Sequence, residues 1–189
     1  AAAGPTTPSQ RTGTGNAATT CAGRGTNDAP ASFSFELHHT GETSMLYPHS
    51  FCARLDVSAG AELDMSLTLT NKDDHPFAIE AAMHTYLRVG DVKDLSFVGF
   101  TDRVYTTTQQ VSVIDPKLDR RIIVDKNGSG STIVWNPWSQ GAATMSDIGE
   151  GEWQHFVCVE TAAVRERALT LWPGHPHIMT QTLAVETLD

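Results

Sequence analysis

The stretch "EAAMHTYLRVGD", residues 80–91, shows the alternation of side chains that decides the fold. Successive side chains of an extended strand point to opposite faces of the sheet. The odd-numbered positions from Met83 to Val89 are mostly apolar and are expected to face the core. The other face of the same strand carries three polar side chains: His84, Tyr86 and Arg88.

Short runs of the same kind, rich in β-branched and aromatic residues, recur from Phe33 to the C-terminus. They are separated by turn signals such as "NKDDHP" (71–76) and "KNGSGS" (126–131). Many short strands at this spacing predict an all-β fold, an antiparallel β-sandwich or barrel. Only two segments, 142–149 and 160–167, have the composition of a helical turn.

The chain is expected to hold one globular domain, residues 32–189, because 189 residues with 40% hydrophobic composition suit a single core. Residues 1–31 contain almost no large apolar side chains and many Gly, Thr, Pro and Ala. Such a segment cannot offset its ordering entropy by burial. We therefore expect a tail, or a piece ordered only by its neighbours.

The charge and cysteine content exclude several classes of protein. A net charge of −9 disfavours nucleic acid as a partner. No apolar run reaches the roughly 18 residues of a membrane helix, and the N-terminus lacks the layout of a secretory signal. Three cysteines without a CxxC pair suit free thiols in a reducing compartment. We expect a cytoplasmic protein, either a monomer or a weak homo-oligomer.

Glu160 is the second unusual residue, because it follows the apolar run "FVCV" and shares a strand face with Phe156 and Cys158. Carboxylates are rarely buried unless they are paired. His84 and Glu160 form a candidate acid and base if the fold brings them together. Two plainer alternatives remain open: His84 is a hydrogen-bonded structural histidine, and Glu160 ends its strand in solvent.

Other kinds of site find little support in the motifs. The histidines, including His38-His39 and "GHPH" (174–177), fit no standard zinc spacing, and there is no HExxH. The chain also has no GxSxG elbow, GxGxxG or Walker loop. We expect no metal and no cofactor.

Seven short motifs follow one another along the chain: "YPHSF" (47–51), "AAMHTYLRVGDV" (81–92), "DRVY" (102–105), "STIVWNPW" (131–138), "MSDIG" (145–149), "VCVE" (157–160) and "PGH" (173–175). In their order and spacing they resemble the glucose-6-phosphate 1-epimerase group of the aldose 1-epimerase (galactose mutarotase-like) family.

This resemblance implies an antiparallel β-supersandwich whose concave sheet binds the sugar. It implies that His84 is the general acid and Glu160 the general base of an anomer exchange without cofactor. Asp102 matches the family's further carboxylate. The substrate is expected to be a hexose or hexose 6-phosphate, with Tyr86, Arg88 and Trp138 as further contacts. The ordinary pKa values of glutamate and histidine, about 4.3 and 6.5, suggest an ionised Glu160, with His84 held protonated by nearby carboxylates. The two groups are expected to approach a hexose ring from opposite sides.

One departure from the family pattern bears on function. Residues 1–31 carry no counterpart of the family's early strands or of its phosphate-binding arginines. The chain therefore looks like a sandwich without its N-terminal strands. A truncated, non-catalytic carbohydrate-binding or interaction module on the same fold is the alternative to an enzyme.

Overall fold

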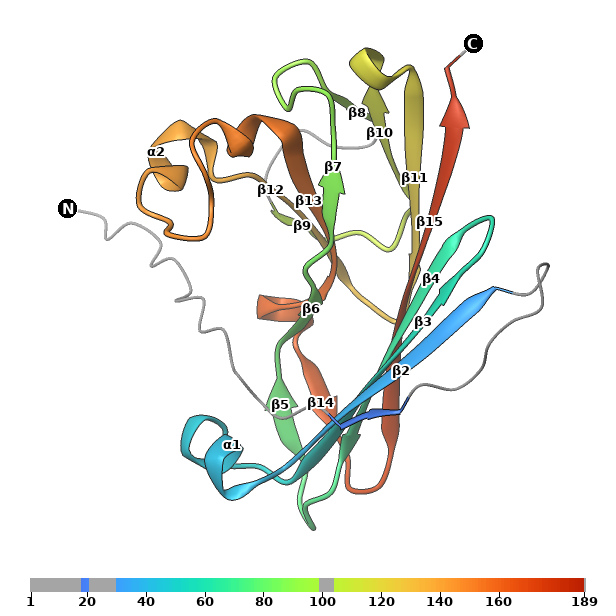
Figure 1. Ribbon diagram of the computed structural model, residues 1–189. Coiled ribbons are helices and arrows are strands. Elements are labelled where there is room, and N and C mark those ends of the chain that lie inside the picture. Colours follow the sequence, from blue (N-terminus) through green and yellow to red (C-terminus); the bar gives the residue numbers. More distant parts are fainter. Residues whose placement is uncertain (1–17, 21–29, 99–103, 189) are drawn as a thin grey trace.

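Two antiparallel sheets of unequal size pack against each other in the computed structural model, which describes residues 18–20, 30–98 and 104–188 (Figure 1). The larger sheet has eight strands. In spatial order they are β1 (Ala18–Thr20), β2 (Ala31–His38), β3 (Phe51–Ala59), β4 (Leu63–Asn71), β15 (Pro176–Thr187), β11 (Arg120–Asn127), β10 (Val111–Asp115) and β8 (Ser96–Val98). The predicted antiparallel β-sandwich is confirmed.

The smaller sheet is built around β13 (Phe156–Ala163), which carries Glu160. One edge of β13 pairs with β12 (Ser131–Trp135), which in turn pairs with β9 (Val104–Tyr105). Its other edge pairs with two short strands in succession, β6 (Ala81–Met83) and β7 (Tyr86–Arg88). A separate two-stranded ribbon joins β5 (Phe77–Ile79) to β14 (Leu169–Leu171).

The main core lies between the two sheets. Apolar side chains of β7, β10, β11 and β13, together with Val89 and Val92 just after β7, form one buried cluster: Leu87, Val89, Val92, Val111, Val113, Ile122, Val124, Val157 and Val159. Within β10, β11 and β13 these positions follow the period of two expected of strands with one face on the core. The opposite face of β13, which carries Phe156, Cys158 and Glu160, is therefore turned away from this cluster.

Helical structure is scarce and lies partly outside the two predicted segments. α1 (Gly41–Leu46) occupies a stretch that reads as a turn, and α2 (Trp138–Ala142) ends where the first predicted segment begins. The first half of segment 160–167 is strand, and a 3-10 turn follows at Arg165–Arg167. The remaining 3-10 turns are Pro116–Leu118 and Glu152–His155. Among the described residues, no helix has the length and apolar character to cross a membrane.

Most of the predicted tail lies outside the described residues. Its residues Ala18–Thr20 form β1, which pairs with β2 at the edge of the larger sheet.

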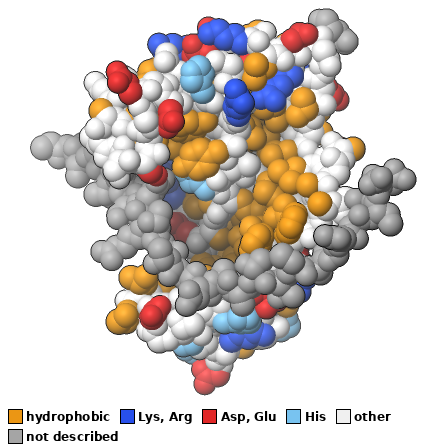
Figure 2. All heavy atoms as spheres, viewed as in Figure 1, with side chains coloured by type: hydrophobic (Ala, Val, Ile, Leu, Met, Phe, Trp, Pro, Cys, Tyr) orange, Lys and Arg blue, Asp and Glu red, His pale blue; other side chains and the backbone are white. Residues whose placement is uncertain are grey.

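In the space-filling view, hydrophobic side chains gather over the middle of the face seen in Figure 1, while charged side chains lie mostly toward its upper and lower ends (Figure 2).

Candidate active site

The strand alternation around His84 is as the sequence predicts. Met83, Leu87 and Val89 are buried, whereas His84, Tyr86 and Arg88 are exposed. His84 lies in the two-residue break between β6 and β7. The backbone stays attached to β13 within this break, because the amide of Val159 donates to the carbonyl of Thr85 at 3.2 Å. The imidazole is thus held on the outer face of the smaller sheet.

Glu160 lies next to His84 in space although 76 positions separate them in the chain. The Nε2 atom of His84 is 3.3 Å from Oε1 of Glu160. The Glu160 side chain is only 6% exposed, so the alternative that it ends its strand in solvent is wrong. At this distance no sugar ring fits between the two atoms. The expectation that they face a hexose from opposite sides is therefore also wrong, because both groups meet at one point.

Aromatic rings surround the histidine. Tyr86 stacks on the His84 ring with centroids 4.8 Å apart, and Trp135 of β12 meets it edge-on at 5.6 Å. Phe156, two positions before Cys158 on the same face of β13, packs against Tyr86 at 5.2 Å. Phe156 was not among the site residues predicted from the sequence, although the alternation of Phe156, Cys158 and Glu160 was the available signal. The rings offer flat apolar surfaces beside two titratable groups.

The other predicted substrate contacts are Arg88, Trp138 and Asp102, and the structure describes the first two. Arg88 is exposed on the same strand face as Tyr86. Trp138 forms an aromatic pair with Trp153, with centroids 5.8 Å apart, at the start of α2. Asp102 lies outside the described residues.

A buried amide behind the sheet links β13, which carries Glu160, to the break between β6 and β7, which carries His84. Gln181 of β15 is fully buried, and its Nε2 donates to the carbonyl of Val159 at 3.1 Å and to Oγ1 of Thr161 at 3.0 Å. Its Oε1 accepts a bond from the hydroxyl of Thr85. These partners are the direct chain neighbours of Glu160 and His84. This residue was not predicted from the sequence, since one glutamine among strand residues gives no signal of its partners.

Burial determines the protonation states of His84 and Glu160. Desolvation raises the pKa of Glu160 to about 7, and partial burial lowers the pKa of His84 below its usual value. The expectation of an ionised Glu160 beside a protonated His84 in the free protein is therefore corrected. At neutral pH the imidazole is mostly neutral, and both proton states of the carboxyl are populated. A group that titrates near the working pH is suited to general acid–base chemistry.

Comparison with known proteins agrees with this architecture. The family described as aldose 1-epimerase matches residues 91–183. A protein of Cenchrus ciliaris is 34% identical over 170 residues, which cover 73% of this chain and 51% of that protein. A protein of Escherichia coli K12 is 30% identical over 159 residues, covering 70% of this chain and 53% of that protein. Both are named "Putative glucose-6-phosphate 1-epimerase".

The fold has a close counterpart among solved structures. The crystal structure of a "putative mutarotase" from Salmonella typhimurium superposes with a TM-score of 0.78 at 22% identity, covering 89% of this chain and 65% of that one. The fold is thus that of the galactose mutarotase-like proteins, and residues 91–183 match the aldose 1-epimerase family, in agreement with the resemblance. Within that family, the chain is related to the glucose-6-phosphate 1-epimerase group. It spans about half the length of the curated relatives it matches.

Proposed function

We propose that this chain is an aldose 1-epimerase that interconverts the α and β anomers of a hexose 6-phosphate. The observation that carries the proposal is the 3.3 Å separation of His84 Nε2 and Glu160 Oε1 beside the rings of Tyr86 and Trp135. The phosphate is taken from the names of the relatives, and the acid and base roles from the family resemblance, which the contact between His84 and Glu160 supports.

The proposed reaction uses the pair when it holds a single proton and that proton has moved from Glu160 to His84, a form that is less populated in the free protein than neutral His84 beside protonated Glu160. Glu160 as carboxylate takes the proton of the C1 hydroxyl, and His84 as imidazolium gives its proton to the ring oxygen. The bond between C1 and the ring oxygen breaks, which opens the sugar to an aldehyde. Rotation about the bond between C1 and C2 presents the other carbonyl face, and ring closure with reversed roles forms the opposite anomer.

The close spacing of the two groups suits this reaction. The C1 hydroxyl oxygen and the ring oxygen are both bonded to C1, so the acid and the base must reach two neighbouring atoms. Each proton transfer is worth about 10²–10⁴-fold in rate. Together the two transfers lower the barrier by about 5–11 kcal/mol. No cofactor enters these steps.

The test is exchange spectroscopy by NMR on equilibrated glucose 6-phosphate, with and without the protein. We expect His84→Ala and Glu160→Gln each to lower the exchange rate about 10²–10⁴-fold while sugar binding persists. His38→Ala is a matched control, because that exposed histidine on β2 pairs only with Glu36 among the described residues. Wild-type exchange rates in Glu160→Gln would refute the acid–base assignment.

A second candidate function rests on the length of the chain. Because the chain spans about half of its curated relatives, we also consider a non-catalytic carbohydrate-binding module. This candidate predicts binding of glucose 6-phosphate, detected by saturation-transfer NMR, without faster anomer exchange in the wild type. Accelerated exchange that depends on His84 excludes it.

A further inference from the structure

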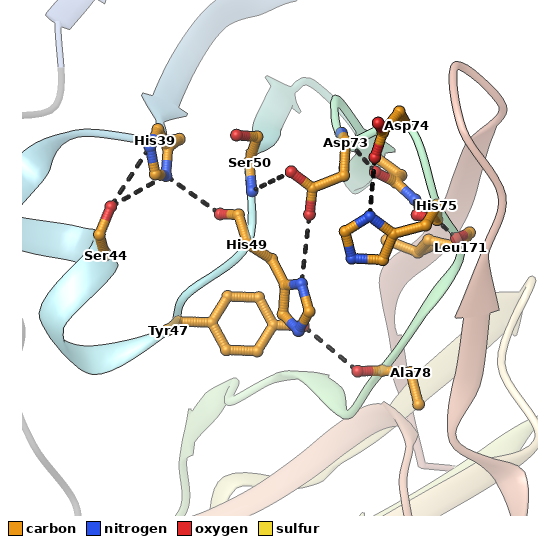
Figure 3. A network of polar contacts seen from close by, with 11 residues as sticks. His39, Ser44, Tyr47, His49, Ser50, Asp73, Asp74, His75, Ala78 and Leu171 are labelled. Carbon is orange, nitrogen blue, oxygen red and sulfur yellow. Dashed lines mark hydrogen bonds and ion pairs between the residues drawn. The ribbon is translucent and has the colours of Figure 1, made fainter.

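A second cluster of ligating side chains lies beside α1 and β5, at the lower end of the molecule in Figure 1. His49 comes from the link between α1 and β3, and Asp73 and His75 from the turn between β4 and β5. One ligand atom from each of the three side chains lies within 4.8 Å of the other two. Figure 3 shows the His49 ring below the Asp73 carboxylate and the His75 ring to the right of His49.

The spacing within the cluster suits a single small cation. Nδ1 of His49 is 3.2 Å from Oδ2 of Asp73. Two ligands bound to one tetrahedral zinc ion at 2.0–2.1 Å lie roughly 3.3 Å apart, so this pair already has the required separation. All three ligand atoms lie within 4.8 Å of one another, so a small inward movement of the His75 side chain completes the set. This side chain is 61% exposed, which leaves room for that movement.

Hydrogen bonds fix the first two ligands in place. Oδ1 of Asp73 accepts from the amide of Ser50 at 3.1 Å, so this carboxylate already joins the two segments. The amide of Asp73 itself donates to Oδ1 of Asn71 at 2.7 Å, which shapes the turn. The His49 ring stacks on Phe77 with centroids 4.2 Å apart. Both ligands are therefore positioned before any ion arrives.

The third ligand has the outer partner that metal-binding histidines usually have. Nδ1 of His75 lies 2.9 Å from Oδ1 of Asp74. Metal-bound imidazoles commonly donate their other ring N–H to a carboxylate, which fixes the tautomer and raises the basicity of the ligating nitrogen. Asp74 therefore leaves Nε2 of His75 as the nitrogen that can bind an ion.

We propose that His49, Asp73 and His75 bind a divalent transition-metal cation, with Zn²⁺ as the best match. Two imidazoles and one carboxylate are nitrogen and oxygen ligands that suit zinc, and three protein ligands leave one coordination position for water. The bound ion clamps the segment that enters β3 to the turn between β4 and β5. The site is separate from His84 and Glu160, and it does not depend on the proposed epimerase activity.

The experiment is a Zn²⁺ titration of the 189-residue chain by isothermal calorimetry, with Co²⁺ absorption spectra as a measure of coordination geometry. We expect one bound ion per chain and a higher melting temperature when Zn²⁺ is added. Asp73→Asn keeps the acceptor for Ser50 and removes the charged ligand, so it tests the site without breaking the turn. It and His75→Ala are each expected to weaken binding more than tenfold.

Two further variants separate this site from nonspecific binding. Asp74→Asn removes only the outer partner and is expected to weaken binding about 10–100-fold. His38→Ala, at an exposed histidine on β2, is expected to bind Zn²⁺ like the wild type. The proposal is overturned if the wild type binds no Zn²⁺ at micromolar concentrations, or if Asp73→Asn and His75→Ala bind as tightly as His38→Ala does.

Discussion

Glu160 is buried, which disfavours its charged form, and the stability of the protein therefore depends on pH. Removing a carboxylate from water favours its protonated form, so burial raises the pKa to about 7 from 4.5. Between these values the native state binds more protons than the unfolded state. The contribution of Glu160 to the free energy of unfolding is therefore fully present below about pH 4.5, and it is lost as the pH rises to 7.

Replacing Glu160 by Gln removes this pH dependence. Each pKa unit corresponds to about 1.4 kcal/mol, so the wild type loses roughly 3 kcal/mol of unfolding free energy from this group between pH 4.5 and 7.5. We expect Glu160→Gln to be more stable than the wild type at pH 7.5 and close to it at pH 4.5. Urea unfolding at both pH values measures the difference, and parallel pH profiles for the two proteins would contradict the raised pKa.

At the scale of residues, the sequence identified the pair but not its ionisation. Two patterns were sufficient to select His84 and Glu160. One is the alternation along residues 83–89, and the other is the position of Glu160 after an apolar run. Their proton states depend on desolvation by residues from other strands, and no local pattern encodes that. The same limit applies to Gln181, whose three partners come from β13 and from the break between β6 and β7.

At the scale of elements, Gln181 connects the two sheets directly behind the site. Gln181→Leu keeps much of the side-chain volume but leaves the carbonyl of Val159 and two hydroxyls without this partner. We expect a loss of about 3 kcal/mol in unfolding free energy. Because small displacements of catalytic groups are costly, we also expect kcat for anomer exchange to fall about 10–100-fold, with KM little changed.

Thr180→Ala is the matched control for Gln181→Leu, because Thr180 lies on the same strand but on its opposite face. It is expected to keep the wild-type kcat. NMR exchange rates and urea unfolding are measured for both variants. If Gln181→Leu is destabilised but has an unchanged kcat, Gln181 supports the fold alone and has no part in positioning His84 and Glu160.

The turn between β11 and β12 requires a glycine for two separate reasons. Gly128 has a φ of +72°, and a Cβ atom placed there would lie 1.9 Å from the carbonyl oxygen of Ile178. Gly174 has a similar φ of +71° but no atom within 4 Å of such a Cβ. We expect Gly174→Ala to cost about 1–2 kcal/mol from the backbone conformation alone. Gly128→Ala should cost clearly more, as measured by thermal unfolding, and equal costs would contradict the steric argument.

Strands were more predictable than helices, for a physical reason. A strand with one face on the core shows its period of two over a few residues, as the run that forms β4 does. The helix α1 has only six residues, too few to show a period of 3.6. Its start is set by a capping box between Thr40 and Thr43, in which threonine takes the place of the usual Glu or Gln. In the sequence, Gly41 within "TGE" (40–42) reads as a turn signal instead.

At the scale of the whole molecule, the chain aligns with only part of its relatives, and the larger sheet has large apolar side chains that remain exposed to solvent. Phe33 and Phe35 of β2 are 44% and 36% exposed, and Val185 of β15 is 60% exposed. By strand register these side chains lie on the same face as the core residues Leu69 and Met179. Among the described residues, the smaller sheet thus covers only part of this inner face. Sequence patterns identify inward-facing residues, but they do not reveal which elements cover them.

The charge of the whole molecule gives the last prediction. A net charge of −9 repels an anionic hexose 6-phosphate at long range. The screening length falls from about 30 Å at 0.01 M ionic strength to about 8 Å at 0.15 M. We expect kcat/KM for glucose 6-phosphate to rise about two- to five-fold over this range, because salt weakens the repulsion. Uncharged glucose is the control and should show no change. A fall in kcat/KM with salt for the phosphate alone would mean that cations near the site, such as Arg88, outweigh the charge of the molecule.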